Sequence, residues 1–257
     1  MPIDKKRGVV IFLDALGVSK YTQITQFLKY CEDLEAFKEE TEYIWTAWQL
    51  NWIKEGVLLS DPDIAFFQDS LIVCFPEPEE DAESTLHHFF AAQNWLMQAI
   101  IMATSKKMFF RGAISNGDYI FNESKRSISV LGNPVVDACK YEKFGDWIGV
   151  IQTPDFRTNY TAALTEYAKI NQKSVDEFSR DYHRFYVKYN VPLKEGGTHP
   201  CCVVNWPTLL KKSNAEEEIR AVLLEGKASA DDENKPKYDN TLKFLDFCKE
   251  NGYFLGQ

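Results

Sequence analysis

The spacing of apolar and polar residues divides the first 155 residues into alternating strands and helices. The run GVVIFL at 8–13 is continuously apolar, which is typical of a strand covered on both faces. Helices are predicted where apolar residues recur every three or four positions. In chain order, we predict a strand at 8–13, a helix at 21–53, a hairpin of strands 64–67 and 71–75, a helix at 81–105, a strand at 108–120, a helix at 135–144 and a strand at 147–152.

This β-α-β-β-α-β-α-β order predicts an α+β fold, a ferredoxin-like α/β sandwich with extra elements. Later residues predict a helix at 160–180, strands at 184–191 and 201–206 around the Gly196-Gly197 loop, and two helices within 216–251. We therefore expect a core over 1–155 and an α/β C-terminal extension over 156–257 that packs on it.

Composition narrows the function classes. The chain of 257 residues has 29 Lys and Arg against 38 Asp and Glu, a net charge of −9, which disfavours a long basic groove and hence a nucleic-acid partner. The six cysteines form no CxxC pair and no zinc spacing with the histidines, which suits reduced thiols. The longest apolar stretch, 89–103, is interrupted by polar residues, so we expect no membrane span and a cytoplasmic location.

Two acidic residues stand where predicted strands end. Asp14 follows the first strand, and Asp69 lies at the hairpin tip. A lone strand-end Asp is more often a turn or cap residue, but two carboxylates at adjacent strand ends are typical of a Mg²⁺ site completed by substrate phosphates. Two such ions, roughly 3.5–4 Å apart, activate a hydroxyl and stabilise a leaving phosphate together.

Residues around these acids suit a phosphate ligand. The turn Ala15-Leu16-Gly17-Val18 offers backbone N–H groups for a triphosphate. Arg111, in a glycine-containing strand, and Lys140, in the helix that follows Gly132, are candidates to neutralise charge on phosphorus oxygens. Arg111 equally suits a structural ion pair, and Lys140 a solvated helix face.

The order and spacing of these motifs resemble the class III nucleotide cyclase catalytic domain, and more closely the bacterial Pycsar pyrimidine cyclases. The resemblance spans about residues 7–152. Phe12 to Gly17 matches the family's Phe-x-Asp-x-x-Gly, and Asp69 falls at its second metal aspartate. Arg111 to Gly117 resembles the family's Arg-x-Gly-Ile-x-x-Gly strand, with Gly112 and Ala113 in reverse order, and Gly132 to Lys140 resembles its Gly-x-x-Val-Asn-x-Ala-x-Arg helix.

The resemblance implies a set of site residues. Metal binding falls on Asp14, Ala15 and Asp69, transition-state stabilisation on Arg111 and Lys140, and nucleotide binding on Leu16, Gly17, Val18, Ala65, Phe67 and Ser129. Two departures stand out: Val136 occupies the family's Asn position and Lys140 its Arg position. Ala65 and Ser129 replace the charged residues with which adenylyl cyclases select adenine, and bulky Phe66 and Phe67 fill space that a purine needs, so ATP is disfavoured.

The implied reaction is intramolecular. The ribose 3′-hydroxyl, activated by two Mg²⁺ or Mn²⁺ ions on Asp14 and Asp69, attacks the α-phosphorus in line, and pyrophosphate leaves. The implied assembly is a homodimer with composite sites. The resemblance favours cyclic UMP made from UTP in bacterial antiphage defence; the alternatives are cyclic CMP made from CTP and an inactive, nucleotide-sensing cyclase-like domain.

Overall fold

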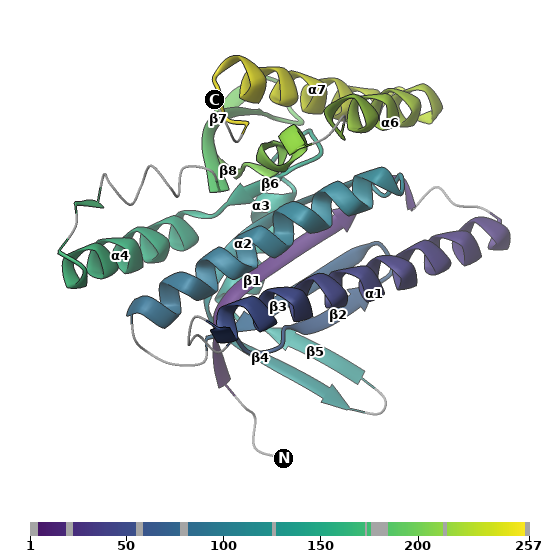
Figure 1. Cartoon of the computed structure of the whole chain (residues 1–257). Helices are drawn as coiled ribbons and strands as arrows, with labels where there is room; N and C mark the ends of the chain where they lie inside the picture. Colours follow the sequence, from purple (N-terminus) through teal and green to yellow (C-terminus); the bar gives the residue numbers. More distant parts are fainter. Residues whose placement is uncertain are drawn as a thin grey trace.

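A mixed β-sheet is the frame of the fold (Figure 1). The computed structural model describes residues 5–18, 23–54, 59–77, 82–124, 127–172, 174–175, 185–212 and 215–254. Within them the strands are β1 (Lys5–Ala15), β2 (Asp63–Phe67), β3 (Ser70–Pro76), β4 (Phe110–Ser124), β5 (Ser127–Leu131), β6 (Val150–Gln152), β7 (Tyr186–Pro192) and β8 (Thr198–Val204). Their order in the sheet is β2-β3-β1-β4-β6-β8-β7, and β5 pairs with β4.

Strand β1 lies inside this sheet and pairs antiparallel with both β3 and β4. Its residues 8–11 are buried, as the continuous apolar run predicts. Strand β4 is antiparallel to β1 but parallel to β6, so the sheet is mixed. These pairings, together with the helices that pack on the sheet, confirm the predicted α+β class and the predicted hairpin of β2 and β3.

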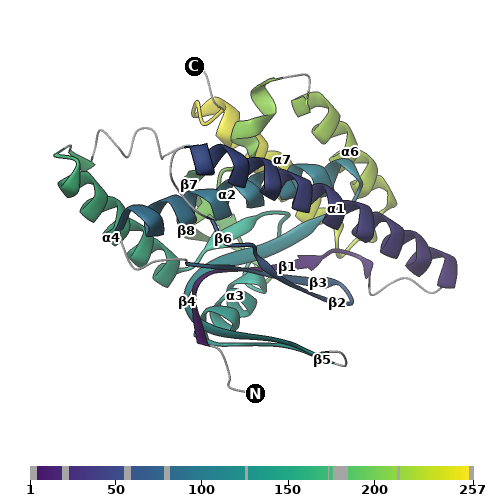
Figure 2. The ribbon, with the colours of Figure 1, turned by 60° about the horizontal axis from the view of Figure 1, so that its bottom comes forward.

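Helices cover the two faces of the sheet unequally (Figure 2). They are α1 (Ile24–Lys54), α2 (Ala82–Ser105), α3 (Asn133–Glu142), α4 (Pro154–Ile170), α6 (Ala215–Ser229) and α7 (Lys235–Glu250), with a 3-10 helix η3 (Trp206–Lys212). Helices α1 and α2 lie on one face, above the large hydrophobic core, while α3 packs beneath β1 and β4 on the other. A smaller apolar cluster, which includes Val10 and Val135, fills the α3 side.

The structure adds a strand that was not predicted and changes the bounds of the helix predicted at 160–180. Strand β5 was not expected: β4 runs on past residue 120 and turns back to form a hairpin with it. Helix α4 begins at Pro154, because Thr153 caps it by accepting a hydrogen bond from the Phe156 N–H, and it ends at Ile170. The rest of the predicted 160–180 helix, from residue 176 onward, lies outside the described residues.

Residues after 155 extend the same sheet and the same core. Strand β8 pairs antiparallel with β6 through Ile151 and Val203, and β7 completes this edge of the sheet. Trp206 and Phe244 are buried in the large core together with residues of β1 and α2. The C-terminal part thus packs on the first part, while the division into two domains near residue 155 stays a prediction.

Two expectations from composition concern this fold. Among the helices of the described segments, none has the length and apolar character needed to cross a bilayer. All six cysteines are free thiols; Cys74 and Cys248 are buried, whereas Cys31 is exposed.

Burial of His88 gives the fold a specific dependence on pH. Its Nε2 lies 2.8 Å from the Phe75 carbonyl oxygen, to which it donates a hydrogen bond, and burial lowers the pKa of His88 to about 4. In the unfolded chain the imidazole has its ordinary pKa near 6.5, so the unfolded state takes up a proton before the folded state does. The free energy of unfolding therefore falls as the pH drops from about 6.5 toward 4. Between pH 7 and pH 5 we expect this residue to remove about 2 kcal/mol from the free energy of unfolding.

Urea unfolding of the wild type and of His88→Gln at both pH values measures this effect. The glutamine amide can still donate to the Phe75 carbonyl but does not titrate, so the variant is expected to lack this part of the pH dependence. Equal losses in the two proteins between pH 7 and pH 5 would rule out His88 as their source.

Candidate functional site

Asp14 lies near the end of β1, where the sheet gives way to a turn. In the sheet register it stands opposite Ser70 of β3 on one side and Arg111 of β4 on the other. The chain turns away at Gly17, whose φ of 85° is in the left-handed region that favours glycine. Asp14 is therefore the last half-buried polar position before the strand leaves the sheet.

Asp69 is held next to this strand end by the backbone. It follows Gln68, whose φ of 53° forms the tight turn between β2 and β3. The Ala15 N–H donates a hydrogen bond of 2.7 Å to the Asp69 carbonyl oxygen. This contact holds Asp69 and Asp14, which are 55 positions apart in the sequence, at one corner of the sheet, as the sequence predicted for the two acids.

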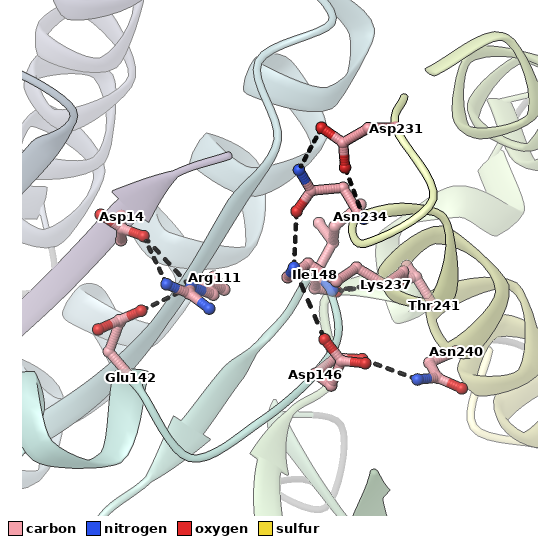
Figure 3. Close-up of polar contacts among 10 residues, drawn as sticks. All are labelled: Asp14, Arg111, Glu142, Asp146, Ile148, Asp231, Asn234, Lys237, Asn240 and Thr241. Atoms are coloured by element: carbon pink, nitrogen blue, oxygen red, sulfur yellow. Dashed lines mark hydrogen bonds and ion pairs between the residues drawn. The ribbon is translucent and has the colours of Figure 1, made fainter. Parts of the chain in front are cut away.

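Arg111 is enclosed by two carboxylates (Figure 3). Its Nε and Nη2 lie 3.2 and 2.9 Å from Asp14 Oδ2, and its Nε lies 2.5 Å from Glu142 Oε1 at the end of α3. The Arg111 and Asp14 side chains are 15% and 19% exposed, whereas that of Glu142 is 3% exposed. Burial raises the pKa of Glu142, and the neighbouring Arg111 guanidinium opposes that shift.

A cavity of about 680 Å³ opens over this corner. One wall consists of Asp14, Ala15, Leu16, Gly17, Asp69 and Arg111. The other wall comes from residues after β6, among them Lys194, Asn234 and Lys237, together with Asp146. The volume is within the range of small-molecule pockets and suits a nucleotide.

The acids of the first wall suit a hard divalent cation. Asp14 and Asp69 supply oxygen donors, and one oxygen of Asp14, Oδ2, already accepts hydrogen bonds from Arg111. No group of three or more His, Cys, Asp or Glu side chains that could hold a metal occurs within the described part of the chain. Two carboxylates completed by substrate phosphates and water match the usual coordination of Mg²⁺, so the residues present fit such an ion.

The structure brings together only part of the predicted site. Six predicted residues line the cavity: Asp14, Ala15, Leu16, Gly17, Asp69 and Arg111. The other five are absent from its lining: Val18, Ala65, Phe67, Ser129 and Lys140. The predicted metal residues thus share one pocket, while the predicted base-reading residues and Lys140 lie elsewhere on the same chain.

Two of these placements correct the expected roles. Ala65 is fully buried in the cluster with Val10 on the α3 side, so its side chain does not contact a base as predicted. Lys140 is exposed, and the residue of α3 that meets Arg111 is Glu142. Arg111 and Lys140, both predicted to stabilise the transition state, therefore do not line the same cavity within one chain.

A third correction concerns the phosphate-binding turn. The Ala15 N–H donates to Asp69, and the Leu16 N–H donates to the Phe109 carbonyl oxygen at 2.8 Å. These two groups are engaged by the protein and do not serve a triphosphate. Of the four backbone N–H groups predicted to bind the triphosphate, those of Gly17 and Val18 are left for this role.

Sequence reasoning missed four residues of this site. Glu142 stands in the Lys-x-Glu that ends the predicted helix, where an acid flanked by lysines is normally solvated, so the sequence carries no signal of its burial. Asp146, Lys194 and Lys237 belong to no motif. Asp146 lies in the loop between α3 and β6, and only the folding of the C-terminal part onto β6 brings Lys194 and Lys237 to the cavity.

Comparisons with known proteins give weak likenesses in structure alone. No protein-family model matches this chain, and no curated protein is similar to it. Similar solved structures include a bacterial light-regulated adenylyl cyclase (11% identity, TM-score 0.48, covering 86% of this chain and 57% of that one). A second is a rhodopsin-guanylyl cyclase catalytic core in complex with ATPαS (13% identity, TM-score 0.46, covering 79% of this chain and 98% of that one). A third is a dimeric guanylyl cyclase domain from the aquatic fungus Blastocladiella emersonii (14% identity, TM-score 0.43, covering 78% of this chain and 97% of that one).

The ion triad of Asp14, Arg111 and Glu142 makes a prediction about stability. Arg111→Gln leaves Glu142 as a buried charge without its partner, so we expect the free energy of unfolding to fall by about 3 kcal/mol. Adding Glu142→Gln removes that charge, and we expect the double variant to regain most of the free energy of unfolding that Arg111→Gln loses. Urea unfolding of the wild type, the single variant and the double variant at pH 7 measures both steps.

Lys106→Gln is the matched control, because Lys106 pairs with Glu40 at 2.9 Å in a more exposed position. We expect this change to cost less than about 1 kcal/mol. If the double variant is as unstable as Arg111→Gln alone, Glu142 does not depend on Arg111.

Proposed function

We propose that this chain is a metal-dependent nucleotide cyclase that makes 3′,5′-cyclic UMP and pyrophosphate from UTP. One observation carries the proposal: Asp14 and Asp69, joined through the Ala15–Asp69 backbone hydrogen bond, line the same cavity as Arg111. Carboxylates that hold divalent ions beside a cation are what the transfer of a phosphoryl group requires.

The chemistry follows from this set of groups. Two Mg²⁺ or Mn²⁺ ions on Asp14 and Asp69 would lower the pKa of the attacking hydroxyl and neutralise phosphate charge. The ribose 3′-oxygen forms a bond to the α-phosphorus, the bond to the bridging oxygen of pyrophosphate breaks, and the hydroxyl proton passes to solvent. Arg111, fixed by Asp14 and Glu142, offers its remaining N–H groups to the charge that develops on the phosphate oxygens.

The choice of base rests on the motif resemblance. Residues 65 and 129 carry no charged group for adenine, because they are alanine and serine. The same resemblance extends the proposal to a second messenger in bacterial antiphage defence, and it makes CTP the competing substrate.

We also propose a homodimer with composite sites. The predicted residues that miss the cavity include Ser129 and Lys140, which are exposed on β5 and α3. The α3 side of the sheet is the less covered one, and Val136 of α3 stands 64% exposed. A partner on that side would bury this apolar side chain and bring its cavity to the Lys140 of this chain.

The metal site is tested by Asp69→Ala. We expect turnover to fall about a thousandfold, since a metal's stabilisation of a transition state amounts to several kcal/mol. The fold is expected to persist, because the bond to Ala15 uses the backbone of residue 69. Pyrophosphate release and cyclic product are measured with each of the four ribonucleoside triphosphates and Mn²⁺.

Asp155→Ala, at an exposed acid of α4 away from the cavity, is the control and is expected to keep wild-type turnover. No pyrophosphate from any triphosphate with the wild type would exclude a cyclase. Release from CTP alone would change the product to cyclic CMP, and release from ATP alone would overturn the pyrimidine assignment.

Composite sites are tested by mixing inactive variants. Asp69→Ala and Lys140→Ala lie on opposite halves of such a site, so their mixed dimers contain one intact site. We expect the mixture to regain about a quarter of wild-type activity, given random pairing of subunits. Steady-state turnover of each protein alone and of the equimolar mixture measures this.

Asp14→Ala mixed with Asp69→Ala is the control, because both changes fall on the same half and no dimer regains a complete site. If the first mixture gains no more activity than this control, each site is built within one chain.

A further inference from the structure

The second wall of the cavity is made by the part of the chain that matches no motif. It brings two lysines to the pocket that holds Asp14 and Asp69: Lys194 in the turn between β7 and β8, and Lys237 in the first turn of α7. Both belong to residues 156–257, for which the sequence predicted packing and no chemistry.

Lys237 is a buried lysine whose ammonium group is held by neighbouring side chains (Figure 3). It is 6% exposed, its Nζ donates to Asn234 Oδ1 at 2.6 Å, and Asp146 Oδ1 lies 3.7 Å away. Asn234 is itself fixed, because its backbone N–H donates to Asp231 Oδ1 at 3.0 Å. A lysine is seldom buried unless its charge is paired, and here the ion pair with Asp146 is long while the shorter contact is to a neutral amide.

Lys194 adds a second positive charge beside the first. Its side chain makes no hydrogen bond or ion pair with any residue in the described segments, although it lines the cavity. Partial desolvation lowers the pKa of Lys194, and the nearby Arg111 and Lys237 lower it further, against the opposing fields of Glu142 and Asp14. Lys194 is thus a cation at the cavity that lacks an ion-pair partner within the described segments, which favours binding of an anion at this point of the wall.

Charge divides the cavity into two sides. On the first wall, Arg111 is neutralised by Asp14 and Glu142, so the remaining carboxylate charge of that wall attracts cations. The second wall also carries three acids. Asp146 lies 3.7 Å from Lys237, Asp232 pairs with Lys235 at 2.8 Å with its side chain 97% exposed, and Glu233 is exposed. A polyphosphate with divalent ions on one side and lysines on the other complements both walls.

We propose that Lys194 and Lys237 bind the polyphosphate of the substrate in the same chain that supplies Asp14 and Asp69. This inference rests on the proposed function for the identity of the substrate, but the anion-binding wall itself can be tested without turnover. It gives the C-terminal extension a role in the site: the extension closes the cavity over the phosphates, and the α3 side stays free for a partner.

Lys194→Ala is the primary variant, because the residue is exposed in a turn and its loss leaves no buried group behind. Calorimetric titration with inorganic tripolyphosphate and Mg²⁺ is expected to show about tenfold weaker binding, the loss of one charge-assisted contact. On the triphosphate that the wild type turns over, we expect KM to rise by about the same factor with kcat nearly unchanged. Lys194→Arg keeps the charge and is expected to retain most of the binding.

Lys188→Ala is the matched control, since Lys188 is an exposed lysine of β7 in the same hairpin and outside the cavity lining. Lys237→Met tests the second lysine, with a thermal melt to verify folding. Equal binding by Lys194→Ala and Lys188→Ala, or no binding of tripolyphosphate by the wild type, overturns the proposal. If the wild type turns over no triphosphate while Lys194→Ala still loses tripolyphosphate binding, the cyclase assignment fails and the anion-binding wall stands.

Discussion

The antiparallel register of β1 and β4 is the constraint on which the site depends. It sets Asp14 opposite Arg111, and Arg111 in turn meets Glu142 at the end of α3. Such a buried triad is costly to assemble and far more costly to leave incomplete, so each member fixes the other two. A slip of one residue in this pairing would turn Asp14 to the opposite face and leave Arg111 against an apolar side chain.

The same register explains how two distant acids meet in one cavity. Because β1 also pairs with β3, the turn that carries Asp69 is drawn to the end of β1 and locked there by Ala15. The site is therefore built from backbone hydrogen bonds and sheet pairing, which hold side chains more firmly than long loops do. Only the second wall depends on the C-terminal part of the chain.

The sequence predicts those parts of the fold whose signal is local. The apolar run of β1 and the long α1 and α2 were predicted because their apolar spacing is strong, and Asp14 and Asp69 because each stands at a strand end. Strand β5 was missed because it is short and largely exposed, so burial leaves little trace in its composition. Glu142 was missed since an acid at the end of a helix is normally solvated, and its burial here follows from the packing of α3 on β4.

The C-terminal part and the cavity are coupled through the loop between α3 and β6. Thr241 of α7 accepts a hydrogen bond from the Ile148 N–H at 2.8 Å, and Asn240 donates to the Asp146 carbonyl oxygen at 2.8 Å. Asp146 faces Lys237 across the same contact region, so the bonds that dock α7 also orient the second wall. That loop joins the helix of Glu142 to the strand beside β4, so one short segment of backbone connects a residue beside the first wall to the residues that dock α7. The extension is thus bound to the site by the same contacts that hold it to the sheet.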